Sequence, residues 1–167
     1  MGTESELLIV ARVAVAAILG AIVGLEREIK GKPAGLRTHL LVCAASCLLI
    51  GLGEVMIHRF QDFQPVQILR TDPIRIIEAI ATGISFIGAG TIIFDRSANK
   101  LEGITTAASI LTTAGIGIAV GLEAYWVAAI TAVMLAAVLF GLGWLEWRLG
   151  WKDDEPNAGE HGGHIAS

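Results

Sequence analysis

Five long apolar runs, each close to the length of a bilayer-crossing helix, constrain the fold of this chain more than any other feature. An α-helix needs about 20 residues to cross a hydrocarbon core of about 30 Å, and it satisfies its backbone polar groups within the segment. The sequence therefore predicts an all-α integral membrane protein, a bundle of about five transmembrane helices. The runs are Leu7–Leu25, Leu40–Ile57, Ile76–Phe94, Ile104–Leu122 and Tyr125–Leu145.

The distribution of lysine and arginine predicts how these helices are oriented. With the N-terminus outside, the inner segments carry 8 basic residues, the outer segments carry 3, and Arg12 lies within the first run. Basic residues are enriched in cytoplasmic loops, so we expect the N-terminus outside and the C-terminus in the cytoplasm. The expected parts are a periplasmic N-terminus (1–6), a transmembrane domain (7–151) and a disordered cytoplasmic tail (152–167).

The fourth run allows two interpretations, because it holds five Ser and Thr residues and is joined to the fifth run by a very short connection. It is either a half-buried, re-entrant element or one arm of a tight helical hairpin. We expect the hairpin, since Gly121 and Glu123 supply a turn and a polar tip.

Arg12 and Glu78 are charged residues within the predicted spans. A charge at this depth is expensive, by about 2.5–3.5 kcal/mol on insertion scales, and it marks either function or a buried pair. At a rise of 1.5 Å per residue, both residues lie roughly 6–8 Å below the outer surface. We expect them to form an ion pair, alone or with Arg75. The alternative is that Arg12 extends to the headgroups and Glu78 is hydrated.

Two pairs of small residues at four-residue spacing predict helix contacts. Gly20 and Gly24 form a GxxxG pair, which lets helices approach closely, either within the bundle or between two copies in a homo-oligomer. Cys43 and Cys47 lie one turn apart in the second run. We expect them to be small apolar contact residues rather than a redox or soft-metal pair.

The charged segment between the first two runs concentrates Glu26, Arg27 and Glu28 before a Pro-Ala-Gly turn, with Arg37 and Thr38 after it. The turn can fold Arg37 back onto Glu26, so we expect a structural ion-pair cluster. An anion-binding or partner-binding site is the second interpretation.

Several function classes find no support in these residues. No nucleophile, base and orienting group form a recognisable set, and no phosphate loop is present, so we expect neither an enzyme nor a cofactor. No basic patch with interleaved aromatic residues indicates nucleic-acid binding. Mg²⁺ needs only one or two carboxylates plus water, so a metal site stays undetermined. The acidic candidates are Glu54, Asp62 and Asp72 on the outer side and Glu26, Glu28, Asp95 and Glu102 on the inner side.

Three motifs occur in order along the chain. The first joins Gly20–Glu28 to Ala34–Val42, the second joins Asp72–Ile76 to Gly83–Ile92, and the third joins Glu102–Ala108 to Ala114–Gly117. In these three motifs and their spacing, the chain resembles the MgtC/SapB family of bacterial inner-membrane proteins over about residues 7–145.

The resemblance implies a multi-pass plasma-membrane protein linked to magnesium homeostasis and, in pathogens, to survival inside macrophages. It implies a regulator that contacts other membrane proteins, such as the ATP synthase, rather than an established magnesium transporter. The positions that it carries over are Glu26, Arg27, Arg37, Thr38, Asp72, Arg75, Gly88, Gly90, Thr105 and Thr106.

Four departures favour the shorter, SapB-like type. Thr105 stands where virulence-type members carry asparagine, Thr112 where they carry cysteine, and Ser85 where glycine is usual. We also expect a short tail in place of the soluble C-terminal domain of many members. We therefore expect a non-enzymatic protein of the lipid bilayer that acts by intramembrane contact. The rival hypothesis is a Mg²⁺ transporter or channel, which needs acidic or carbonyl-lined positions along its depth.

Overall fold

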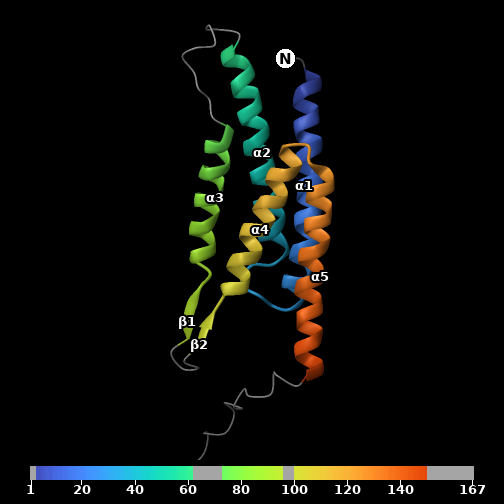
Figure 1. Ribbon diagram of the computed structural model, residues 1–167, viewed down its shortest axis with the longest axis vertical. Coiled ribbons are helices and arrows are strands. Elements are labelled where there is room, and N and C mark those ends of the chain that lie inside the picture. The colour runs from blue at the N-terminus through green and yellow to red at the C-terminus, as the bar shows by residue number, and fades with distance from the viewer. Residues whose placement is uncertain (1–2, 62–72, 96–99, 150–167) are drawn as a thin grey trace, which may run out of the picture.

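The computed structural model describes residues 3–61, 73–95 and 100–149. Helices form at all five predicted runs and lie roughly along one direction (Figure 1). The predicted all-α architecture is therefore confirmed. The helices are α1 (Thr3–Ile29), α2 (Leu36–Gln61), α3 (Pro73–Ala89), α4 (Ile104–Gly121) and α5 (Tyr125–Leu149).

Three of the described helices, α1, α2 and α4, are long and apolar enough to cross a bilayer. The apolar part of α5 is shorter, at Tyr125–Gly141, and α3 has 17 residues. The inside or outside position of the termini stays a prediction. The loop at 62–72 and the predicted tail at 152–167 lie outside the described residues.

The third helix ends earlier than the apolar run predicts. Gly90 and Thr91 turn the chain, and the Thr91 hydroxyl donates a hydrogen bond of 2.7 Å to the carbonyl of Gly88. The chain then enters an antiparallel pair of short strands, β1 (Ile93–Asp95) and β2 (Lys100–Glu102), in which Ile93 lies opposite Glu102. The sequence pattern did not predict this ladder, and the expected turn at residues 97–99 lies outside the described residues.

Helix α4 is continuous over 18 residues and turns directly into α5, so the predicted tight hairpin of two helices is formed. Glu123 makes the turn with a positive φ of 61°. The Glu123 amide donates 3.0 Å to the Val120 carbonyl, and the Ala124 amide donates 2.8 Å to the Ala119 carbonyl. These bonds satisfy carbonyls that the end of α4 leaves without helical partners.

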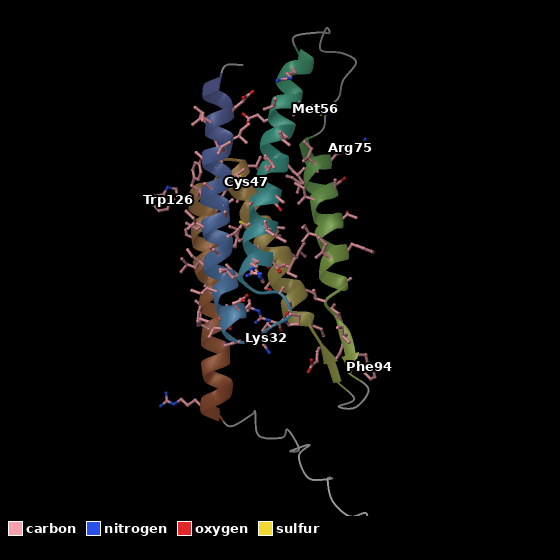
Figure 2. The ribbon with its side chains drawn as sticks, turned by 180° about the vertical axis from the view of Figure 1, so that it is seen from behind. Lys32, Cys47, Met56, Arg75, Phe94 and Trp126 are labelled. Carbon is pink, nitrogen blue, oxygen red and sulfur yellow. The ribbon has the colours of Figure 1, made fainter. Side chains whose placement is uncertain are left out.

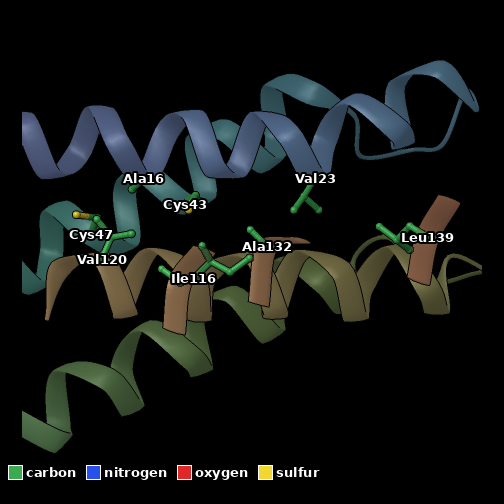
Figure 3. Packing of buried hydrophobic residues seen from close by; sticks show 9 residues of the cluster. Ala16, Val23, Cys43, Cys47, Ile116, Val120, Ala132 and Leu139 are labelled. Atoms are coloured by element: carbon green, nitrogen blue, oxygen red, sulfur yellow. The ribbon is translucent and has the colours of Figure 1, made fainter. Parts of the chain in front are cut away.

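The core lies where α1, α2 and α4 meet, with α5 packed on one side and α3 on the other (Figure 1). Figure 3 shows buried side chains from α1, α2 and α4 facing one another, with α5 side chains among them. This cluster consists of Ala16, Val23, Cys43, Cys47, Ile116, Val120, Ala128, Ala132 and Leu139.

Glycines bring the three central helices into backbone contact. A Cβ on Gly20 would lie 2.7 Å from the Cβ of Cys43, and one on Gly24 would lie 2.8 Å from the Cα of Leu36. A Cβ on Gly117 would overlap the carbonyl oxygen of Cys43. Gly20 and Gly24 thus hold α1 against α2 within one chain, and both are buried there. Their faces are not available to join two copies.

Candidate functional site: two charged layers

Two groups of charged side chains lie at different heights in the bundle. We name them after the predicted orientation: the inner layer is Glu26, Arg27 and Lys30, near the α1–α2 turn, and the outer layer is Arg12, Glu54 and Glu123, near the α4–α5 turn. Each layer joins helices that are distant in the sequence. Together they contain most of the ion pairs found in the described ranges.

Glu26 is the centre of the inner layer and is fully buried. Lys30, four residues later and directly after the end of α1, places its Nζ 2.5 Å from Oε1, and Arg27 places its Nη1 3.6 Å from Oε2. Neither carboxylate oxygen makes a well-aligned hydrogen bond, and neither does the Nε of Arg27. The two neighbouring cations compensate the charge of Glu26, but its hydrogen-bonding capacity is not used up.

Helix α4 covers this layer with hydroxyl groups. The Nη2 of Arg27 donates 3.1 Å to the Oγ1 of Thr106, whose side chain is buried at the start of α4. Lys30 reaches the opposite neighbour and donates 3.0 Å to the backbone carbonyl of Leu139 in α5. Arg27 and Lys30 therefore tie the end of α1 to both α4 and α5.

His39 extends the polar contacts from α2 to α4. Its Nδ1 lies 2.9 Å from the Gly35 carbonyl, which only accepts, so Nδ1 carries the proton. Its Nε2 lies 3.0 Å from the Oγ of Ser109. The Ser109 hydroxyl itself donates a hydrogen bond of 2.8 Å to the Thr106 carbonyl. His39 and Ser109 are both buried. The pair has the composition of a hydrolase dyad, but neither side chain is exposed in this structure.

The expected contact of Arg37 with Glu26 is not formed. Arg37 is the second residue of α2 and is exposed, whereas Lys30 follows Glu26 on the same helical face. Glu28, from the same charged segment, accepts a hydrogen bond of 2.9 Å from the Leu36 amide. It thereby caps the first turn of α2, where a carboxylate is favoured by the free amides and the helix dipole. The ion-pair cluster exists, but Lys30 and Arg27 are its cations.

Arg12 centres the outer layer, with a side chain only 12% exposed. Its Nη1 lies 3.1 Å from the Oε2 of Glu54 on α2 and 3.4 Å from the Gly121 carbonyl, and its Nη2 pairs with Glu123. The expected Arg12–Glu78 pair is therefore not formed. Glu78 is exposed on α3, which packs against α2 and α4 rather than beside Arg12. The position of Glu54 within the second apolar run was the feature of the sequence that could have identified it as a partner of Arg12.

Some of the remaining motif residues are buried and others are exposed. Gly88 is buried, and a Cβ on it would lie 3.5 Å from the Cβ of Ala107 in α4, whereas Gly90 is exposed. Thr105 is exposed beside buried Thr106, and Thr38 is half-buried. Arg75 is exposed at the start of α3, and Asp72 lies outside the described residues.

An apolar layer separates the two charged layers. Its members are fully or almost fully buried, and the two cysteine thiols are free. The layer holds no charged side chain, and the buried hydroxyls beside it, of Ser46 and Thr113, donate to carbonyls of their own helices. It consists of Ala16, Cys43, Cys47, Ile116 and Val120.

An open crevice lies at the outer layer between α2, α3 and the α4–α5 turn. Its volume is about 430 Å³, and it is lined by Arg12, Glu54 and Glu123 together with Ile76 and Ile77. Within the described ranges, no three His, Cys, Asp or Glu side chains come close enough to hold a metal ion. The crevice therefore combines apolar walls with carboxylates already engaged by Arg12.

Comparison with known proteins places this geometry in a family context. The family model described as the MgtC family matches residues 13–148. Protein SapB of Bacillus subtilis is 32% identical over 85% of this chain, and the putative magnesium transporter YhiD of Escherichia coli is 38% identical over 83%. Protein MgtC of Salmonella typhimurium is 34% identical over 73%.

These alignments cover 60%, 62% and 47% of the respective relatives, so the chain matches only part of each relative's length. No solved structure matches the chain.

Proposed function

Because the chain belongs to the MgtC family, we propose that it is a non-enzymatic, multi-pass protein of the bacterial inner membrane, linked to Mg²⁺ homeostasis, that acts by contact with partner membrane proteins. The link to Mg²⁺ is supported by the name of the relative described as a putative magnesium transporter. The family resemblance makes the ATP synthase one candidate partner.

The observation that carries the contact mechanism is the apolar layer between the two charged layers. A Mg²⁺ ion takes oxygen ligands in near-octahedral geometry and gives up its water reluctantly, so a path needs oxygen atoms at successive depths. Cys43, Cys47, Ile116 and Val120 offer none from their side chains, and their backbone groups lie within helices. The buried hydroxyls at this depth, those of Ser46 and Thr113, each donate 2.8 Å to a carbonyl of their own helix. The interior favours a sealed bundle, whose function is exerted at its surface.

Mg²⁺ transport is the second candidate function. It is supported by the fully buried Glu26, whose carboxylate oxygens keep unused hydrogen-bonding capacity, and by the name of the Escherichia coli relative. In this alternative, Glu26 would sit at the inner end of a path that opens in another state.

A flux measurement separates the two candidates. Purified protein is reconstituted into liposomes that contain a Mg²⁺-sensitive dye, and an inward Mg²⁺ gradient is applied. The contact mechanism predicts the rate of protein-free liposomes, while a Mg²⁺ ionophore gives the full signal. Robust flux that is abolished by Glu26→Gln or Glu78→Gln, but kept by Glu102→Gln at an exposed position, would establish transport and overturn the proposal.

A growth assay at limiting Mg²⁺ tests whether exposed surface residues contribute to function, as the contact mechanism requires. Phe86 and Trp126 lie away from the bundle core, with 83% and 82% of their surfaces accessible. Figure 2 shows the Trp126 side chain pointing away from the bundle. The proposal predicts that at least one of Phe86→Ala and Trp126→Ala changes the Mg²⁺-dependent growth while expression stays normal. A phenotype that is unaffected by both would count against surface contacts at these positions.

A further inference from the structure

The outer face of α3 is one of the surfaces that the described residues leave uncovered. We define this face by the exposed residues Arg75, Glu78, Ala79, Thr82, Gly83 and Phe86. They recur at intervals of three and four residues, so they form one stripe along the helix. The opposite side of α3 is packed: Ile80 is buried, and Ile84 contacts the cluster of Ala34, Val42, Ile110 and Ala114.

The upper part of this face lies level with the Arg12 layer. Ile76 of α3 occupies the space beside Gly53 of α2, directly before Glu54 in the chain. The outer crevice is lined by Ile76 and Ile77 together with Arg12 and Glu54. Arg75 and Glu78 flank Ile76 and Ile77 in the helix, so they stand at the height of this layer.

That height is within the apolar part of the surface. On α1, the side chains before Arg12 are apolar and open, with Leu7, Leu8 and Val10 exposed by 67%, 58% and 65%. On α2, Met56 beyond Glu54 is exposed by 57%. Leu7 lies five residues before Arg12, or about 7.5 Å along a helix. In a bilayer that covers these apolar side chains, Glu78 lies at the same depth.

Among the described residues, the charges on the outer face of α3 have no ion-pair partner on another helix. No ion pair of Arg75 or Glu78 occurs among the described residues, and Figure 2 shows Arg75 directed away from the bundle. A charged side chain exposed to hydrocarbon is unfavourable, and it is usually found paired or facing a protein neighbour. Thr82 and Gly83 continue the polar and small stripe to greater depth.

We propose that the outer face of α3 binds the same face of a second copy of this chain. A twofold axis along the membrane normal keeps both copies in the same orientation and places equal depths opposite each other. Arg75 and Glu78 are one turn apart, about 4.5 Å along the helix, so Arg75 of each copy reaches Glu78 of the other. The face carries one charge of each sign and is complementary to itself.

Small residues allow the approach that this pairing requires. Ala79 and Gly83 are four residues apart, and a Cβ on Gly83 would meet no atom within 4 Å. Small residues at this spacing let two helix backbones pack closely in lipid. Phe86, which is 83% exposed in one chain, becomes covered one turn deeper. This inference is independent of whether the bundle conducts Mg²⁺.

Disulfide cross-linking at the proposed axis tests the pairing. Ala79→Cys is oxidised in proteoliposomes at a high lipid-to-protein ratio, and Val127→Cys, 59% exposed on α5 near the same layer, is the matched control. We expect Ala79→Cys to form a covalent dimer at least several-fold more than Val127→Cys. Equal cross-linking in the two variants would show random collision and overturn the proposal.

Exchanging the charges of Arg75 and Glu78 provides a second test of the proposed dimer. In the Ala79→Cys background, Arg75→Glu or Glu78→Arg alone places like charges together and should reduce the dimer several-fold. Combining both substitutions restores complementarity and should restore the dimer. Loss without restoration, in protein that elutes as a single folded species, would overturn the proposal. So would a cross-linked product in native membranes whose mass corresponds to a different protein.

Discussion

The guanidinium of Arg27 on α1 donates a hydrogen bond of 3.1 Å to the Oγ1 of Thr106, which begins the buried face of α4. The two residues are 79 positions apart in the sequence. Both are almost fully buried, so water does not replace the bond when it is lost. This contact connects the first and third motifs that identify the family.

Removing the hydroxyl from Thr106 should therefore destabilise the bundle. Thr106→Val keeps the shape but leaves a buried guanidinium short of an acceptor, and a hydrogen bond to a charged group is worth about 1.5–3 kcal/mol. Thr106→Ser keeps the oxygen and should lose much less. Thermal unfolding in detergent measures both variants. Equal losses would show that packing of the methyl group, rather than the hydroxyl, supports this site.

Double-mutant cycles should couple Arg12 to Glu54 and Glu123 but not to Glu78. Residues in direct contact give interaction energies of about 0.5–3 kcal/mol, whereas separate sites add within about 0.3–0.5 kcal/mol. We expect Arg12→Gln with Glu123→Gln, and with Glu54→Gln, to be non-additive in the free energy of unfolding. Arg12→Gln with Glu78→Gln should be additive. Coupling in the last cycle alone would contradict the observed outer layer.

The α4–α5 turn should prefer glycine to alanine at position 123. Glu123 has a φ of 61°, in the left-handed region that disfavours residues with a Cβ. Glu123→Gly and Glu123→Ala both lose the pair with Arg12, so their difference isolates the backbone term. Glycine should be more stable by about 1 kcal/mol. Thermal unfolding that finds the alanine variant equal or better would argue that the turn changes its conformation.

A methyl group should lower the stability of the protein at Gly117 but not at Gly115, two residues earlier on α4. In Gly117→Ala, the new Cβ meets the carbonyl of Cys43 and lies 3.0 Å from the Cβ of Ser46. Overpacking of this kind costs about 1–3 kcal/mol. In Gly115→Ala, the Cβ meets no atom within 4 Å, so we expect no loss of stability. The melting temperatures in detergent compare them directly, and a larger loss at Gly115 would contradict the packing of α4 on α2.

Hydropathy predicted the helices well, because lipid leaves the backbone of an apolar run no alternative to a helix. Neighbour relations were harder to predict. Depth placed Arg12 and Glu78 at similar heights, but depth does not determine which helices are adjacent, and α3 lies away from Arg12. Glu54, in the second apolar run and at the height of Arg12, could have been predicted as its partner.

The inner layer shows the same limit. Glu26 and Lys30 have the four-residue spacing of a helical ion pair, a local signal that favours Lys30 over Arg37 as the partner of Glu26. Contacts of His39 with Ser109 and of Arg27 with Thr106 join distant segments, and no local pattern encodes them. The strands β1 and β2 have three residues each, too few for an alternating pattern to be recognised.

Thiol reactivity of Cys43 and Cys47 in native membranes tests the central claim, a bundle sealed between its two charged layers, most directly. Both thiols are free and fully buried in the apolar layer, and they are the only cysteines of the chain. A membrane-permeant maleimide should leave them unlabelled in the folded protein and label both after denaturation, while Leu122→Cys at the exposed turn is labelled at once. Rapid labelling of Cys43 and Cys47 in the folded wild-type protein would reveal water inside the bundle and contradict this account.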